Sequence, residues 1–296
     1  MAQSRLDRGE QVNGWAFVMP ALVLLGLFMI YPIFWSLWMS FQVGRGANVS
    51  FGGFANIQRL ANDALFVKAL MNNGIFFVVQ VPVMIILAII FAVTLNDMTL
   101  KFRGLFRTAL FLPSVTSLIA YSSLFKSMFS TDGIINQSLL TLHVIATPIP
   151  WLTDPFWARV VIIAAITWRW TGYNMIFYLA ALQNVDKSIY EAARIDGVPA
   201  WARLTHITIP MLKPVILFTT VLSTIGTLQL FDEVNNITQG GPANATLTLS
   251  LYIYNLTFRM MPNYGYAATV SWVIVVIVAI LSFIQFMIVR ERGRVS

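Results

Sequence analysis

Arg169 lies within a long, mostly apolar stretch, and this position suggests a binding role. A charge at the centre of a membrane helix costs at least about 2.5–3.5 kcal/mol, so the side chain is expected to face a cavity or a protein partner. Trp168, Tyr173 and Asn174 lie close to it in the sequence. An aromatic ring can stack on the apolar face of a sugar while amide and guanidinium groups bind its hydroxyls. These residues are therefore candidates for contact with a polar solute.

Gln229, Asp232 and Glu233 form a second polar group, at the end of another apolar stretch. One interpretation is that they line an outer vestibule or contact an external protein, and the other is ordinary solvation of a helix end. Either carboxylate also offers Arg169 an interhelical ion pair in place of solute contact. The sequence leaves these alternatives open.

The sequence predicts no catalytic or metal-binding chemistry. There is no cysteine, and the two histidines, His143 and His206, are too distant in sequence for zinc-ligand spacing. No carboxylate pair or nucleophile triad indicates hydrolysis. No GxxxxGK[ST] phosphate-binding loop occurs, because the Gly240-Gly241 pair is followed by Pro242. We therefore expect a protein that is not an enzyme and that holds no cofactor or metal of its own.

The composition indicates an integral membrane protein. Of 296 residues, 58% are hydrophobic and 10% are charged, whereas soluble domains carry about 25% charged residues. The net charge of +7 does not require nucleic acid, since lysine and arginine retain membrane-protein loops in the cytoplasm. Twelve of the 19 basic residues, Arg294 among them, fall on the side that holds both termini, so we expect both termini to be cytoplasmic.

Six helical spans are predicted, because a span needs about 20 mostly apolar residues and leaves no backbone polar group unpaired. They lie near residues 15–41, 70–96, 106–128, 159–183, 213–233 and 266–289 of a single transmembrane domain, 1–296. The first is longer than a signal-peptide core and lacks a clear cleavage site, so it is expected to be retained. Residues 133–153 are too polar to cross. Residues 247–258 leave a seventh span as the alternative.

The segment at residues 185–210, between the fourth and fifth spans, is predicted to form two short helices. Ser188 and Glu191 have capping-box spacing, and Gly197 can end the first helix in the left-handed conformation. Pro199 suits the first turn of the second helix, which we expect Pro210 to break before the fifth span. The alternative is a simple amphipathic surface loop.

This segment resembles the EAA loop of binding-protein-dependent ABC importer permeases, which follows the pattern EAA-x3-G-x9-I-x-LP. The matching positions are Glu191, Ala192, Ala193, Gly197, Ile207 and Pro210. Ile209 stands where leucine is usual, and Asp196 before Gly197 is typical of the sugar-importing branch. Three further segments also resemble permeases of the maltose and glycerol-phosphate type: residues 51–60 after span one, 168–185 leading into the EAA loop, and 230–254 after span five.

The resemblance implies an all-α, six-span permease of a type I ABC importer in the bacterial inner membrane, with a cytoplasmic helix-turn-helix coupling loop. It implies four further proteins: a second permease, two ATPases that use ATP and magnesium, and an external solute-binding protein. Glu191 would anchor the loop to an ATPase, and Gly197 would form its turn. A disaccharide or oligosaccharide is the expected cargo, followed by a monosaccharide or glycerol-phosphate. The alternative, an ion-driven secondary transporter, needs an inverted repeat and membrane-embedded acidic groups that the sequence does not show.

Overall fold

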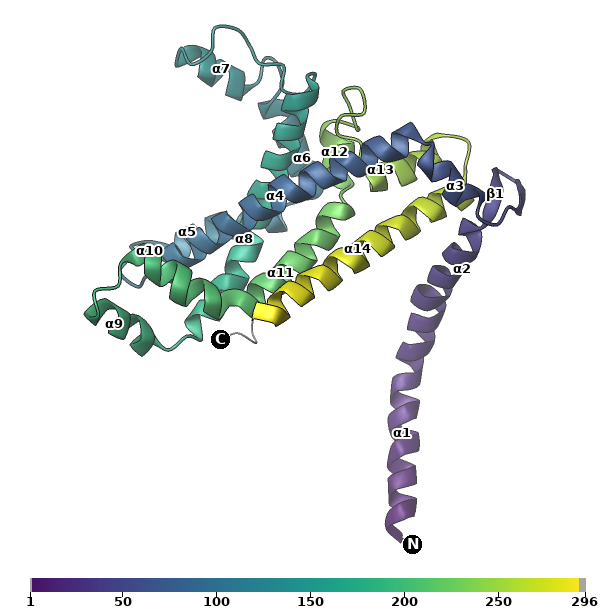
Figure 1. The fold of residues 1–296 in the computed structure, drawn as a ribbon, viewed down its shortest axis with the longest axis horizontal. Coiled ribbons are helices and arrows are strands. Elements are labelled where there is room, and N and C mark those ends of the chain that lie inside the picture. Colours follow the sequence, from purple (N-terminus) through teal and green to yellow (C-terminus); the bar gives the residue numbers. More distant parts are fainter. Residues whose placement is uncertain (1, 293–296) are drawn as a thin grey trace. The chain divides into compact units, whose positions relative to one another are not determined.

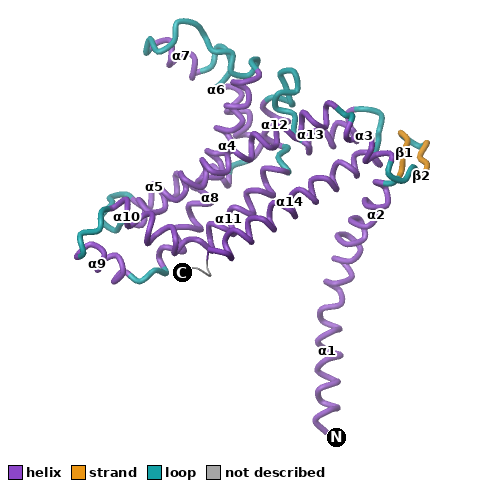
Figure 2. The backbone as a smooth tube through the Cα atoms, in the orientation of Figure 1, coloured by secondary structure: helices purple, strands orange, loops and turns teal. Residues whose placement is uncertain are grey.

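The computed structural model describes residues 2–292, and most of them are helical, which confirms the predicted all-α class (Figures 1 and 2). Within the described part, the only sheet is a hairpin of β1 (Gln42–Arg45) and β2 (Asn48–Phe51). The chain forms two compact units. Unit one holds the residues up to Asn62 together with Ile253–Trp272, and unit two holds Asp63–Tyr252 and the residues from Val273 onward. Arg294, which contributed to the predicted orientation, lies outside the described residues.

Unit one contains a long N-terminal helix, formed by α1 (Ala2–Leu25), a π-helical turn (Gly26–Ile30) and α2 (Tyr31–Ser40). Its Glu10–Ser40 part is long and apolar enough to cross a membrane. Side chains in its most apolar window are not buried against the described chain. Its apolar surface is therefore left for lipid or another protein chain.

A polar tie joins the remaining elements of unit one at the end of α2. Asn56 of α3 (Ala55–Ala61) donates from Nδ2 to the main-chain oxygen of Ser40 over 2.9 Å. Thr269, in the first part of α14 (Tyr264–Arg292), donates to the same oxygen over 3.0 Å. One carbonyl that α2 leaves unpaired at its C-terminus is thus satisfied twice.

In unit two, α4 (Ala64–Asn96), α8 (Pro155–Gln183) and α11 (Ile209–Leu228) pack together (Figure 1). Their common core consists of Ala88, Ile89, Ala92, Leu95, Met175, Tyr178, Leu179, Leu182 and Leu212. Small residues at a helix contact let the backbones approach closely, and this is a main source of packing energy within a membrane. Asp63 and Asp154 cap α4 and α8, and their Oδ1 atoms accept hydrogen bonds from first-turn N–H groups.

The third predicted span is corrected by the structure. The straight helix expected at 106–128 is a pair, α5 (Arg103–Val115) and α6 (Leu118–Met128), whose axes differ by 100°. Thr116 and Ser117 between them have extended backbones, and Pro113 in the last turn of α5 lacks an N–H group. The Thr116 hydroxyl donates to the Pro113 oxygen over 2.7 Å and so compensates a carbonyl at the break.

Five described helices are long and apolar enough to span a membrane, or six if the bent pair counts as one. The five are Glu10–Ser40, Ala64–Asn96, Pro155–Gln183, Ala200–Leu228 and Tyr264–Ile288. The shorter helices are α7 (Ile134–Thr141), α9 (Lys187–Ile195), α10 (Ala200–Arg203), α12 (Asp232–Ile237) and α13 (Leu249–Tyr254). In unit two, α6, α7 and α12 gather at one end, and α9 and α10 lie at the opposite end (Figure 1).

Candidate functional site

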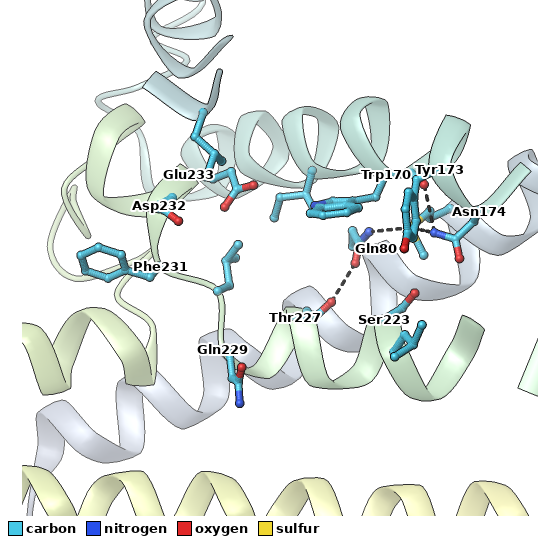
Figure 3. Close-up of a pocket in the computed structure, with 16 residues that line it drawn as sticks. Gln80, Trp170, Tyr173, Asn174, Ser223, Thr227, Gln229, Phe231, Asp232 and Glu233 are labelled. Carbon is cyan, nitrogen blue, oxygen red and sulfur yellow. Dashed lines mark hydrogen bonds between the residues drawn. The ribbon is translucent and has the colours of Figure 1, made fainter. Parts of the chain in front are cut away.

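Unit two contains a cavity of about 400 Å³, bordered by α4, α6, α8, α11 and the segment that follows α11 (Figure 3). Its polar and aromatic lining residues are Gln80, Trp170, Tyr173, Asn174, Ser223, Thr227, Gln229, Phe231, Asp232 and Glu233. Aromatic surface with a few polar groups is the usual composition of a small-molecule site. The volume is in the range of such sites.

Helical spacing explains which side chains reach the cavity. Trp170, Tyr173 and Asn174 are three and four residues apart on α8, so they share one face of the helix. Helix α11 ends at Leu228, and the five residues that follow it, 229–233, form one wall of the cavity. The cavity therefore exists because α11 stops where α4 and α8 continue.

Hydrogen bonds fix the amide groups of the cavity wall. Thr227 donates from Oγ1 to Gln80 Oε1 over 3.1 Å, as the dashed line in Figure 3 shows. Asn174 donates from Nδ2 to the Trp170 oxygen over 2.9 Å, and its amide also lies 3.4 Å from the sulfur of Met84. Rigid polar groups of this kind preorganise a site for a hydroxyl-rich ligand.

The charged groups of the cavity are both acidic. Asp232 and Glu233 line it, and none of its described lining residues is lysine or arginine. Glu233 is largely buried, with 5% of its surface exposed. A carboxylate can accept hydrogen bonds from hydroxyl groups but repels an anionic ligand. The lining residues therefore offer an anionic ligand no cationic group.

Arg169 lies outside the cavity lining and is almost fully buried. Its guanidinium carbon is 4.8 Å from the centroid of the Tyr121 ring and 5.6 Å from that of Trp170, so two aromatic faces stabilise the charge. It also interacts electrostatically with Glu233. Its Nε and Nη1 atoms have no hydrogen-bond partner among the described residues. In this conformation Arg169 matches the interhelical alternative.

The predicted solute-binding residues thus fall into two sets. Tyr173, Asn174, Gln229 and Asp232 line the cavity, whereas Trp168 and Arg169 do not. Trp168 packs against Tyr121 and Phe125 of α6, at centroid distances of 6.2 and 5.5 Å.

Sequence reasoning missed Gln80, Trp170, Ser223 and Thr227, all of which line the cavity. For Trp170 the signal was present, because it precedes Tyr173 by three residues on the same helix face. Gln80 offered a comparable signal, because it is the lone polar residue in the apolar stretch 74–93 of the second span.

The second candidate site is the loop at residues 185–210, where the start of the first helix differs from the prediction. Asp186, and not Ser188, is the N-cap of α9, and its Oδ1 accepts a hydrogen bond from the Ser188 N–H over 2.9 Å. This hydrogen bond lowers the pKa of Asp186. Glu191 is therefore displaced from the capping-box position and is exposed on the surface of α9.

Gly197 ends α9 as its sequence position predicts, with φ at +70°. The Val198 N–H donates to the Ala193 oxygen over 2.9 Å, and the Gly197 N–H donates to the Arg194 oxygen over 3.1 Å. These two hydrogen bonds define a Schellman motif, which favours glycine at the left-handed residue. Asp196 precedes the turn and is exposed, whereas Ala193 is buried.

The predicted break at Pro210 is wrong. The chain is helical from Ala200 through α10, a π-helical turn (Leu204–Thr208) and α11, so the loop joins the fifth span directly. Pro210 lies in the first turn of α11, just after the π turn, where its missing N–H is tolerated. Ile207 belongs to this π turn.

A hydroxyl pair ties the first loop helix to the fifth span. The hydroxyl oxygens of Tyr190 on α9 and Thr208 in the π turn lie 3.1 Å apart. Outside this tie, Ile195 and Trp201 are 86% and 67% exposed, which leaves apolar surface at this end of unit two. Such exposed apolar side chains beside the exposed Glu191 suit contact with another protein.

Comparison with known proteins places this architecture in a family. Residues 48–293 match the family described as binding-protein-dependent transport system inner membrane component, over most of the chain. The chain belongs to this family. The resemblance inferred from the EAA pattern is thereby confirmed.

Individual relatives agree with this assignment. The chain is 65% identical over 293 residues to the lactose transport system permease protein LacF of Rhizobium radiobacter, covering 98% of each chain. It is 33% identical to the arabinooligosaccharides transport system permease protein AraP of Halalkalibacterium halodurans, covering 93% of this chain and 87% of that one. Its fold is similar to that of a chain of a bacterial ABC transporter involved in import of the acidic polysaccharide alginate. That match has a TM-score of 0.85 at 22% identity and covers 98% and 99% of the two chains.

Proposed function

We propose that this permease forms part of the translocation path for a neutral sugar, a disaccharide or oligosaccharide. The observation that carries this proposal is the cavity, which combines the Trp170 and Tyr173 rings with fixed amides and two carboxylates. Lactose and arabinooligosaccharides, the cargoes in the relatives' names, are neutral and suit such a wall. The alginate transporter is named for an acidic polysaccharide, and Asp232 and Glu233 disfavour a substrate of that charge.

The acidic wall also disfavours glycerol-phosphate, an anionic cargo that the family resemblance left open. The guanidinium group of Arg169 lies outside the cavity lining, so it offers an anion no direct contact from the wall. A monosaccharide remains compatible with the polar groups of the cavity. We therefore place neutral sugars first and anionic solutes last.

The energy source and partners are part of the same proposal. ATP and magnesium are used by two separate ATPase subunits, because this chain carries no phosphate-binding loop. The loop at residues 185–210 docks on one ATPase through Ile195, Trp201 and the Glu191 carboxylate. Its continuity with α11 lets movement of the ATPase reach the cavity wall.

Placement in the membrane follows from this docking. The α9 end of unit two faces the cytoplasm together with both termini, and the opposite end faces an external solute-binding protein. A second permease completes the path, and this chain has no enzymatic activity of its own.

Uptake measurements in liposomes test the proposal. The complete importer is reconstituted with its solute-binding protein and supplied with internal ATP. Labelled lactose, an arabinooligosaccharide, glycerol-phosphate and an acidic oligosaccharide are then compared. We expect ATP-dependent uptake of a neutral sugar and none of the acidic compounds. Uptake driven by an ion gradient without ATP would refute the assignment and favour a secondary transporter.

A further inference from the structure

Asn73, on α4, is fully buried and joins two helix ends. Its Nδ2 donates to the main-chain oxygens of Thr227 (3.2 Å) and Leu228 (2.9 Å), at the C-terminus of α11. Its Oδ1 accepts from the N–H of Leu249, the first residue of α13, over 2.9 Å. The Thr227 oxygen also accepts from the Leu230 N–H over 3.3 Å. The Leu228 oxygen and the Leu249 N–H lie at helix ends, where intrahelical partners are lacking, and the Asn73 side chain pairs with both.

The chain between these two anchors supplies one cavity wall. Residues 229–233, which line the cavity, begin directly after the oxygens held by Asn73 (Figure 3). Thr248, next to the second anchor, donates from Oγ1 to the Leu230 oxygen over 2.7 Å and is itself fully buried. Asn73 therefore ties both ends of the chain between Leu228 and Leu249 to α4. Thr248 ties Leu230, the second residue of the cavity wall, to the end of this stretch.

The adjacent residue, Asn72, has the same chemistry and burial but different partners. It is 1% exposed, and its Nδ2 donates to the main-chain oxygens of Asn244 and Leu247, each over 2.9 Å. These oxygens belong to the loop beyond α12 and not to the cavity wall. Asn72 is therefore a matched reference for the cost of removing a buried asparagine from α4.

We propose that Asn73 is a positioning residue for the solute cavity, which sets where residues 229–233 stand against α8. Gln229 lies on the non-helical stretch 229–231 and Glu233 lies in the first turn of α12. Main-chain shifts of about 1 Å are enough to misplace the polar groups of such a wall. Asn73 touches no solute and acts through the wall that it holds. This inference rests on the proposed sugar site.

Direct binding to the purified importer complex tests the role. Labelled lactose is equilibrated with the detergent-solubilised complex in the absence of the solute-binding protein, so that only the cavity is measured. Asn73→Ala and Asn72→Ala are compared with the wild type, and complex yield and ATP hydrolysis report assembly. We expect Asn73→Ala to weaken lactose binding about tenfold and Asn72→Ala to change it less than twofold, with both complexes assembled.

Four results would count against this role. Unchanged lactose affinity in Asn73→Ala, or an equal loss in Asn72→Ala, would overturn the positioning role. If Asn73→Ala does not assemble, the milder Thr248→Val removes one tie to Leu230 and is expected to weaken binding about threefold; unchanged affinity in that variant would likewise overturn it. Failure of the wild-type complex to bind or transport any sugar would overturn the proposed function itself, and this inference with it.

Discussion

Gly172 marks a very close contact between α8 and α5, and its replacement by alanine gives a quantitative test. A Cβ atom added there would stand 1.8 Å from the main-chain oxygen of Leu110 on α5 and 2.5 Å from its carbonyl carbon. Ordinary contact begins at 3.4 Å, so the two helices would have to separate locally by about 1.6 Å. Both atoms are backbone, so no side chain can rotate away to relieve the contact.

The cost follows from two opposing terms. Overpacking of a tight contact costs about 1–3 kcal/mol, and a clash with backbone belongs at the upper end of that range. Alanine is favoured over glycine inside a helix by about 1 kcal/mol. Gly172→Ala is therefore expected to destabilise the permease by about 2 kcal/mol. At about 2–4 °C per kcal/mol, the melting temperature falls by about 4–8 °C.

The assay is thermal unfolding of the purified complex in detergent, followed by loss of soluble assembled protein. Gly74→Ala on α4 is the matched control, because an added Cβ there meets no atom within 4 Å. We expect that variant to melt at or slightly above the wild-type temperature. If the Gly172 variant melts at the same temperature as the control, α5 and α8 do not approach each other as closely as the structure shows.

Other predictions concern the loop and the cavity. Gly197→Asp puts a side chain at a φ of +70°, so binding-protein-stimulated ATP hydrolysis and uptake should both fall at least tenfold while the permease still inserts; normal coupling would contradict the docking role. The lowered pKa of Asp186 means that its cap stabilises α9 at neutral pH and is lost as pH falls below 3.8. At such a pH, pepsin should cleave the loop of the wild type faster than the loop of the Asp186→Asn variant. Equal cleavage rates would refute this prediction. Removing the cavity charges with Asp232→Asn and Glu233→Gln should raise uptake of an acidic oligosaccharide relative to lactose, and an unchanged ratio would refute the charge argument.

Local sequence rules predicted the loop at residues 185–210 only in part. The left-handed turn at Gly197 depends on neighbouring backbone alone, so its sequence position was sufficient. The cap was misplaced because Asp186 and Ser188 are both good caps, and the choice depends on where α8 ends and on the extended backbone of Asp186. Pro210 did not break the helix, because it follows a π turn and lies in the first turn of α11, where the missing N–H group of proline is tolerated.

The sequence by itself determined that this is a helical membrane protein and a member of its permease family. Hydrophobicity over about 20 residues and the spacing of the EAA pattern are properties of contiguous chain, so they need no tertiary information. Which polar residues share the cavity was decided only by the tertiary structure. Arg169 and Trp170 are neighbours in sequence, yet only Trp170 lines the cavity, because successive residues on a helix point in different directions. The wall at residues 229–233 likewise depends on Asn73, more than 150 residues away, whose bonds form only when α4 and α11 have packed.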